Sequence, residues 1–481
     1  MKAWLGVVIG GLLLAGSTQA LPAQDAGQSA QQTTPVTLTV DQAISKALAN
    51  QPLLQQAQAA VEAARARVGE ANSAYFPFVS GNASYNRLSD QSFALSALIP
   101  PQLAGMIPSS VAPLLNSPLS LVPVNVWDFN VGLNQVIFQF GKRGIQVKLA
   151  ESGVLAAQIG VDQIRMSLAF QAAQGFYSVL FLKGQVAALD SQLANLQEHL
   201  AATRVKAQTG AATRYDELST EVRVSTLQSQ RIDAQNQLTK QSIGLKQLMG
   251  IDESAPLDLQ GDFSASADGS GDQQALINSA MARRPEVRQA TESERSAELS
   301  RRLATTSGWP TISGHASVGY KNGILPDINT PAFNWVAGVQ VNVPLFEGFL
   351  IAKQEEEADK RLLAARENTL AVKRTVTTQV LQAMQDVDAG RDQVQSAQVQ
   401  LHQAQEVLDV VKLQYDLGML TNLEYLDAQA ALERAQLGSL LAQYREVLNE
   451  YALRQATGTP IWQQPVQGGT ETSRGAVAPA P

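Results

Sequence analysis

The strongest constraint on this chain is an internal repeat whose two copies keep one register for more than 100 residues. Matching positions in 138–250 and 346–458 are separated by 208 residues throughout, and no gap is needed. Such a register implies long helices whose two copies end at the same height. The matched residues include Phe138 with Phe346, Gly210 with Gly418, Thr213 with Thr421, Asp216 with Glu424, Leu218 with Leu426 and Gly250 with Gly458.

The offset between the copies is larger upstream, where residues 42–52 resemble 274–285. It falls by 25 residues between the two strand regions, so 88–125 is an enlarged loop of the first copy and 321–334 is its short counterpart. Each copy reads helix, strand, loop, strand, long helix, turn, long helix. We predict a first repeat at 38–250, with a strand pair in 78–138 and a helical hairpin at 141–250, and a second at 272–458, with a strand pair in 311–346 and a hairpin at 349–458.

Three further segments connect or flank the repeats. Residues 21–37 read as an N-terminal linker and 251–271, rich in Gly, Ser and Asp, as a linker between the copies. Residues 459–481 lack periodicity, which predicts a disordered tail. Gly184 and Gly390, near the middle of the two descending helical runs, are candidates for a helix break.

The first 20 residues have the pattern of a secretory signal peptide. Lys2 is followed by an apolar run, and Thr18-Gln19-Ala20 forms a small-x-small cleavage site. A transmembrane anchor is the weaker interpretation because the apolar run is too short. The chain has no cysteine, so we expect an exported protein that is not lipidated.

Composition excludes several kinds of site. Without cysteine there is no disulfide, cysteine zinc site or thiol nucleophile. A net charge of −7 with dispersed Lys and Arg is not typical of nucleic-acid binding. His199, His315 and His402 are far apart and outside any motif, so we expect surface or interface histidines and no metal site. We predict no cofactor and no enzymatic activity.

The long helices require a partner. The run 142–209 would span about 100 Å at 1.5 Å per residue, too long for an isolated globule. Ala, Gln, Leu and Val dominate and only 6% of residues are aromatic, a composition that suits helices packed closely through small side chains. We therefore expect the rod to pack against copies of itself.

Four short segments alternate apolar and polar residues and indicate strands: 79–85, 127–137, 312–320 and 335–345. Each is long enough to cross a bilayer when tilted, although a soluble sandwich with one dry face would show the same alternation. Four strands cannot close a barrel and lipid forbids unpaired edges, so three chains would be needed for a 12-stranded barrel. Aromatic residues at the strand ends are candidates for two membrane girdles: Tyr85, Trp127, Tyr320 and Trp335 at one end, and Tyr75, Phe76, Trp309, Phe138 and Phe346 at the other.

The two helical turns share a signature. Gly210 and Gly418 end the descending helices, where a left-handed residue is favoured. Thr213 and Thr421 begin the ascending ones, with Asp216 and Glu424 three residues later, which predicts two capping boxes. Asp427 lies three residues beyond Glu424 on the same helix face and has no capping role.

Residues 38–458 resemble the TolC family of outer membrane efflux proteins. The resemblance rests on the doubled helix–hairpin–helix order, on Pro77 and Pro310 before the strands, on Pro344-Leu345-Phe346-Glu347-Gly348 after the last strand, and on the two turn signatures. Residues 138–141 (Phe-Gln-Phe-Gly) are a degenerate version of the Pro344 motif.

This resemblance implies a mainly α protein with a small β part. It implies a homotrimer with a 12-stranded β-barrel in the outer membrane, continued by a 12-helix periplasmic tube with a closable lower end. It also implies a pore constriction at Asp427, Glu424 and Asp216, although capping alone would explain Glu424, and Asp216 is better interpreted as a partner between helices at the same level. The turns would dock a periplasmic adaptor protein or be simple turns; the residues concerned are Thr209, Gly210, Leu417, Gly418, Met419 and Leu420.

The function that follows is a passive export duct recruited by an adaptor and an inner-membrane transporter. Drug efflux, type I protein secretion and metal efflux remain open as cargo classes. A self-standing outer-membrane porin would explain the strands but not the long helices. A trimeric coiled-coil surface adhesin would explain the helices but not the repeated strands.

Overall fold

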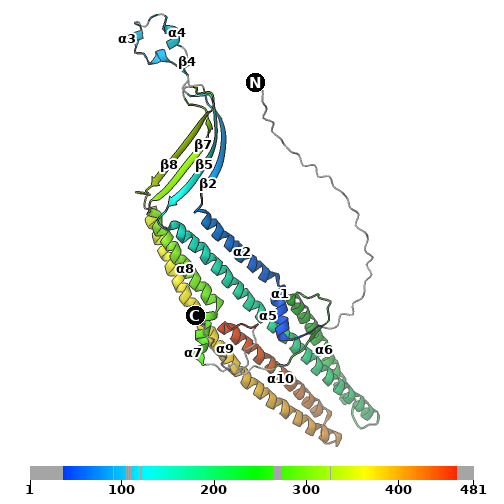
Figure 1. Cartoon of the computed structure of the whole chain (residues 1–481). Coiled ribbons are helices and arrows are strands. Elements are labelled where there is room, and N and C mark those ends of the chain that lie inside the picture. The colour runs from blue at the N-terminus through cyan, green and yellow to red at the C-terminus, as the bar shows by residue number, and fades with distance from the viewer. Residues whose placement is uncertain are drawn as a thin grey trace, which may run out of the picture.

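The structure is a computed structural model that describes residues 36–89, 92–104, 106, 108, 110–116, 118–119, 122–263, 272–324 and 327–462. The signal peptide expected at 1–20 lies outside the described residues. The chain forms an elongated rod with a curved sheet toward one end and two helical hairpins at the other (Figure 1). It is mainly helical with a small β part, as the sequence predicts.

Two long helical hairpins form the lower part of the rod. The first joins α5 (Lys142–Gln208) to α6 (Arg214–Met249), and the second joins α9 (Leu350–Asp416) to α10 (Asn422–Thr457). The hairpins match in length, because α5 and α9 have 67 residues each and α6 and α10 have 36.

Gly184 and Gly390 do not break their helices, so that expectation is wrong. Both lie where a neighbouring helix approaches closely. A Cβ at Gly184 would lie 3.0 Å from Leu440 Cδ2, and one at Gly390 would lie 3.1 Å from Asn449 Nδ2. The glycines therefore permit close packing of α10 against α5 and α9.

Shorter helices extend the wall toward the sheet. They are α1 (Val40–Asn50), α2 (Pro52–Ser73), α7 (Gln273–Arg283) and α8 (Pro285–Thr305), followed by a 3-10 turn at Thr306–Gly308. In α2 and α8 a proline occupies the first turn, where its missing N–H costs nothing. Near the sheet the helices pack in the order α2, α5, α8, α9, and near the tip in the order α6, α5, α10, α9. The wall is one helix thick.

The main core lies at mid-height, where the segments between the helices meet the wall. Strands β1 (Val36–Leu38) and β6 (Leu257–Leu259) pair in parallel, and Leu38 and Leu259 pack into a cluster around Phe176, Met249 and Val447. Both expected linkers thus contain a paired strand. Residues 459–462 are also ordered, since Ile461 is only 2% exposed, so the expectation of disorder is wrong there. Residues 463–481 lie outside the described residues.

The antiparallel sheet has the order β2, β5, β7, β8. Its strands are β2 (Phe78–Arg87), β5 (Asn125–Phe138), β7 (Thr311–Lys321) and β8 (Ala332–Asn342). The register separates two faces, because apolar rows such as Gly81–Val131–Val318–Trp335 alternate with polar rows such as Asn82–Asn130–Gly319–Asn334. Strands β2 and β8 are the two edges.

The aromatic residues at the far end do not share one register row. Tyr85 pairs with Trp127, whereas Tyr320 pairs with Phe333, and Trp335 pairs with Val318. This stagger is typical of strands that run obliquely to the axis. At the junction with the helices, Phe140 packs against Phe138 and Trp309, and Phe349 packs against Phe346.

The described residues of the enlarged loop of the first copy lie beyond the far end of the sheet (Figure 1). Its described parts include β3 (Phe93–Ala94) paired with β4 (Pro118–Leu119), a 3-10 turn at Leu95–Leu98, α3 (Pro101–Ala104) and α4 (Ala112–Leu115). Of the helices in the described part of the chain, none is both long enough and apolar enough to span a bilayer.

Candidate functional site at the helical tip

The two hairpins end side by side at the tip of the rod, in turns of one design. Gly210 and Gly418 have positive φ angles of 81° and 73°. In the first turn, the N–H of Ala211 donates to the carbonyl of Lys206 over 2.7 Å; in the second, Met419 donates to Gln414 over 2.9 Å. These are Schellman motifs, which satisfy the last carbonyls of α5 and α9.

Both ascending helices begin with a capping box. Asp216 Oδ2 accepts from the N–H of Thr213 over 2.9 Å, while the Thr213 hydroxyl accepts from the N–H of Asp216. In the second hairpin, Glu424 Oε2 accepts from the N–H of Thr421 over 2.7 Å. This backbone hydrogen bond and a second one from the Thr421 hydroxyl lower the pKa of Glu424, because they stabilise its charged form.

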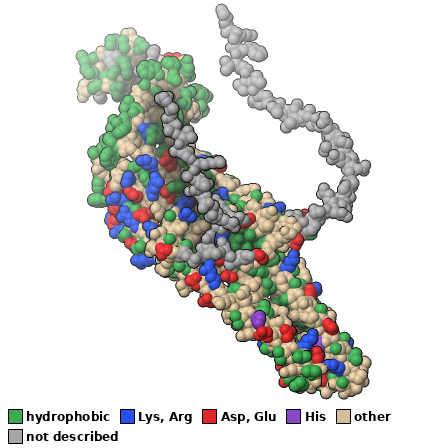
Figure 2. All heavy atoms as spheres, turned by 60° about the horizontal axis from the view of Figure 1, so that its bottom comes forward, with side chains coloured by type: hydrophobic (Ala, Val, Ile, Leu, Met, Phe, Trp, Pro, Cys, Tyr) green, Lys and Arg blue, Asp and Glu red, His purple; other side chains and the backbone are tan. Residues whose placement is uncertain are grey.

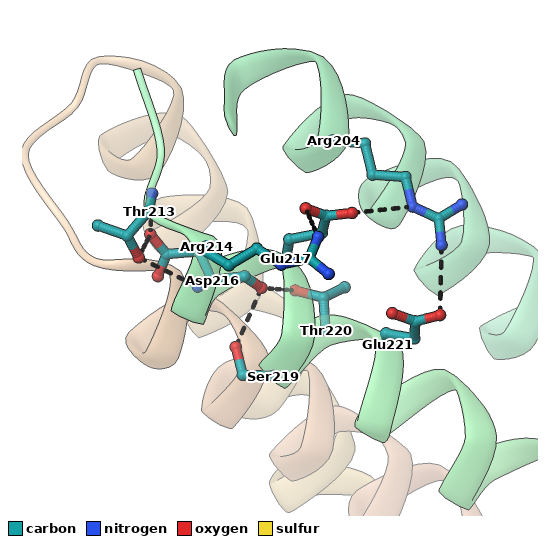
Figure 3. A network of polar contacts seen from close by, with 8 residues as sticks. All are labelled: Arg204, Thr213, Arg214, Asp216, Glu217, Ser219, Thr220 and Glu221. Carbon is teal, nitrogen blue, oxygen red and sulfur yellow. Dashed lines mark hydrogen bonds and ion pairs between the residues drawn. The ribbon is translucent and has the colours of Figure 1, made fainter. Parts of the chain in front are cut away.

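Ion pairs beside the first box link α5 to α6 (Figure 3). Arg204 lies 3.4 Å from both Glu217 and Glu221, and Arg214 contacts Glu217 at 2.5 Å. Most of these groups are exposed, and such pairs contribute little individually. Their effect is to orient the start of α6 against the end of α5.

The side chain of Asn422 joins three helices. Its Nδ2 atom donates to the Asp216 carbonyl over 3.2 Å and to Thr220 Oγ1 over 3.1 Å, both on α6. Its Oδ1 atom lies 2.8 Å from His199 Nε2 on α5. Asn422 is 5% exposed, so the start of α10 is fastened to the first hairpin by buried hydrogen bonds.

His199 lies among aromatic rings. Its ring centroid is 4.3 Å from that of Tyr425 and 5.4 Å from that of Tyr415, and Lys206 Nζ lies over the Tyr415 ring. Burial lowers the pKa of His199 below its ordinary value of 6.5. A groove of about 440 Å³ opens beside these rings between α5, α9 and α10, with Glu198, Asp409, Lys412 and Asp416 on its walls.

A second contact between the hairpins lies higher on the rod. Arg223 on α6 contacts Glu433 on α10 at 2.7 Å, and Gln192 on α5 donates to Gln436 on α10 over 2.6 Å. Glu433 is nearly buried and Arg223 is partly exposed. Polar contacts therefore connect the two hairpins at more than one level.

The structure brings the three acids proposed for the pore to one end of the rod but gives them different surroundings. The carboxylate of Asp216 closes its capping box and its backbone carbonyl accepts from Asn422. The carboxylate of Glu424 accepts hydrogen bonds from the N–H and the hydroxyl of Thr421 in the second capping box. Asp427 is exposed, and within the described residues its carboxylate makes no hydrogen bond or ion pair.

The residues proposed for docking form an exposed rim around the turns. Thr209, Gly210, Leu417, Gly418 and Met419 are exposed and Leu420 is half-buried. Leu417 and Met419 expose 67% and 69% of their surface. Charged and apolar side chains are interspersed over the helical part, whereas the far end of the molecule is mostly apolar (Figure 2). In the described part of the chain, no cluster of His, Asp or Glu could hold a metal ion.

Sequence reasoning missed the buried residues between the hairpins. Of the two positions expected for a lone histidine, surface or interface, His199 occupies an interface between the hairpins, and Asn422, the residue after the Thr421 cap, is buried beside it. The only local signal for Asn422 is a polar residue at the first helical position, directly after the cap. The pairing of His199 with Asn422 joins positions 223 residues apart.

The family model of outer membrane efflux proteins matches residues 43–251 and 276–459. The chain belongs to this family. It is 27% identical to the outer membrane efflux protein BepC of Brucella suis over 333 residues, which are 68% of this chain and 71% of BepC. It is 22% identical to the outer membrane protein TolC of Escherichia coli over 350 residues, 70% of each chain.

Solved structures of outer membrane proteins share the fold. The CmeC outer membrane channel of Campylobacter jejuni aligns with a TM-score of 0.73 at 18% identity, covering 88% of this chain and 86% of that one. VceC of Vibrio cholerae aligns with a TM-score of 0.72 at 17% identity, covering 87% and 96%. The predicted outer membrane efflux function is thus confirmed, and a channel of this family is a transport duct and not an enzyme.

Proposed function

We propose that this outer membrane efflux protein works as a homotrimeric exit duct. Three sheets form a 12-stranded barrel in the outer membrane, and three helical walls form a 12-helix tube that extends into the periplasm. The duct is passive and is gated at the helical tip. A periplasmic adaptor recruits it to an inner-membrane transporter, which supplies the energy.

The sheet supports the barrel. Its edges, β2 and β8, run in opposite directions, so β8 of one protomer fits beside β2 of the next in the antiparallel sense used throughout the sheet. Closure satisfies the backbone groups of both edges, which lipid would otherwise leave unpaired. The apolar face suits lipid and the polar face suits a water-filled lumen.

The edges of the helical wall support the trimer. Along α6, positions 215, 218, 222, 225, 229, 232, 236, 239 and 243 follow a heptad spacing and are all exposed. Tyr215, Val222 and Ile232 in this stripe are each more than half exposed. The opposite edge, α9, exposes Val407, Val410 and Leu413 at comparable spacing. Packing α6 of one protomer against α9 of the next would bury both stripes.

The gate assignment rests on Asp427, whose exposed carboxylate has no partner in the described part of the protomer. In a trimer, Asp427 and Glu424 supply six carboxylates around the lumen at the tip. A ring of this kind favours cations and binds multivalent ones. Asp216 acts beside the ring as a helix cap and not as a lumen group.

Single-channel recordings in planar bilayers test the gate. The variant Glu424→Ala with Asp427→Ala should raise conductance and weaken block by multivalent cations, because it widens the constriction and removes six charges per trimer. Asp233→Ala, which removes an exposed acid of α6 above the tip, is the matched control and should change neither. Unchanged conductance and block in the double variant would remove the gate assignment.

A further inference from the structure

We propose that His199 and Asn422 form a clamp between α5 and α10 at the tip, and that protonation of His199 releases this clamp and opens the duct. The inference rests on the gated tip proposed above. It adds two positioning residues that lie outside the carboxylate ring and act within one protomer.

The hydrogen bonds of Asn422 settle which ring nitrogen of His199 carries hydrogen. The carbonyl of Asp216 can only accept, so the amide end that faces it must be Nδ2. The other end, Oδ1, then faces His199 Nε2 at 2.8 Å and also can only accept. Nε2 is therefore the donor, and in the neutral ring Nδ1 is unprotonated.

Protonation adds a second donor to this ring. The imidazolium needs an acceptor for Nδ1–H, and among the described residues the ring makes no hydrogen bond through Nδ1, while the Tyr425 and Tyr415 rings pack beside it. The groove beside the ring presents carboxylates of Glu198 on α5 and of Asp409 and Asp416 on α9. A ring that turns toward these acids withdraws Nε2 from Asn422, which removes the hydrogen bond between α5 and α10, while the hydrogen bonds of Asn422 to α6 remain.

Other charges around His199 act in both directions. Burial and Lys206 on α5 oppose the imidazolium, whereas the hydrogen bond to Asn422 and Asp416 on α9 favour it, and burial is the largest of these effects. Lys412 on α9 also lines the groove. The facing part of α6 contributes the Asp216 carbonyl and Thr220 through Asn422, and the carboxylate of Asp216 is held in its own capping box. The facing part of α10 contributes Tyr425. Burial raises the pKa of Tyr425, so this side chain stays neutral.

The sign of the pH dependence follows from burial. In the closed tip, burial lowers the pKa of His199, whereas in a loosened tip the ring titrates near its ordinary 6.5. Between these two pKa values the loosened state binds more protons. The clamp is fully effective above about pH 6.5 and weakens as the pH falls toward the lowered pKa.

The first test measures the open probability of the full-length channel in planar bilayers from pH 8 to pH 5. Wild type should open several-fold more often at pH 5.5 than at pH 7.5. His199→Gln keeps a donor for Asn422 without titrating, so it should stay closed across this range. Asn422→Ala should be open at both pH values. His402→Gln changes an exposed histidine of α9 and should behave as wild type.

The second test measures the separation of α5 and α10 directly. The chain has no cysteine, so Gln197→Cys and Leu423→Cys, both at exposed positions, can be spin-labelled without background. Between pH 7.5 and 5.5 the distance should lengthen in the wild-type background and stay constant with His199→Gln.

The outcomes separate the clamp from the duct. A His199→Gln profile like that of wild type, or an Asn422→Ala channel that stays closed, would overturn the clamp. The open probability of the wild-type channel could also be independent of pH while Glu424→Ala with Asp427→Ala raises conductance. In that case the clamp is wrong and the gated duct is still supported. If the distance between the spin labels changes with pH but the open probability does not, the opening step is contradicted, and the proposal fails with it.

Discussion

Arg223 and Glu433 illustrate how much a single contact between the hairpins contributes. Arg223→Met leaves the nearly buried Glu433 carboxylate without its partner at 2.7 Å, which should cost about 2 kcal/mol. Adding Glu433→Met should recover most of this loss, because two apolar side chains replace the pair without a stranded charge. Thermal dissociation of the purified trimer measures the difference. Arg65→Met, in an exposed pair with Glu62, is the control and should change stability by less than about 0.5 kcal/mol.

At this scale the sequence predicts what is local. The partners in the capping boxes of Thr213 and Thr421 are three residues apart, so their hydrogen bonds could be inferred from spacing alone. Arg223 and Glu433 are 210 positions apart, and nothing in either neighbourhood indicates the other. The burial of His199 depends in the same way on helices from the other half of the chain.

Two glycines at helix ends separate backbone strain from steric contact. Gly418 and Gly458 follow α9 and α10 with φ angles of 73° and 72°, but only Gly458 is crowded, since a Cβ there would lie 2.9 Å from the Arg284 nitrogen. Gly418→Ala should cost about 1 kcal/mol, the price of a left-handed alanine. Gly458→Ala should cost clearly more, because the backbone between α7 and α8 must also move. If the Gly418→Ala and Gly458→Ala trimers lose the same amount of thermal stability, the backbone between α7 and α8 moves without a measurable cost.

Elements with a strong period were predictable and those formed by distant pairing were not. The long helices and the four sheet strands follow from repeated apolar spacing and from the register shared by the two halves. Strands β1 and β6 have three residues each and pair across more than 200 positions, too short and too distant for any pattern to reveal. The sequence does not reveal the role of Gly184 and Gly390, because a glycine that bends a helix and a glycine that lets a neighbouring helix approach have the same local pattern.

At the scale of the whole molecule, the two faces of the sheet predict opposite responses to charge. Val339 lies on the apolar face of β8 and Gln340 on the polar face. Val339→Lys should reduce the amount of trimer in the outer membrane, since a lysine facing lipid costs about 2–4 kcal/mol at mid-bilayer. Gln340→Lys should leave assembly intact and reduce the cation preference of the channel. Assembly lost equally in both variants would argue against a lipid-facing side.

Recruitment by the adaptor is tested at the tip. Gly418→Asp places a charge and a strained residue in the exposed rim beside Leu417 and Met419. Cross-linking in intact cells should lose the adaptor while the trimer persists on gels. Gly69→Asp, at an uncrowded helical glycine near the sheet, is the control. Retained cross-linking in Gly418→Asp would rule out docking at this rim.

The equal lengths of the two hairpins restrict how this molecule can change. Deleting one residue of α5 above His199 would move the lower part of that helix by about 1.5 Å and rotate it by about 100°. His199 would then no longer face Asn422, and the two turns would end at different heights. Helix length must therefore change in both halves together. The described parts of the loop at 88–125 project away from these contacts, so variation in chain length among relatives is expected to accumulate there.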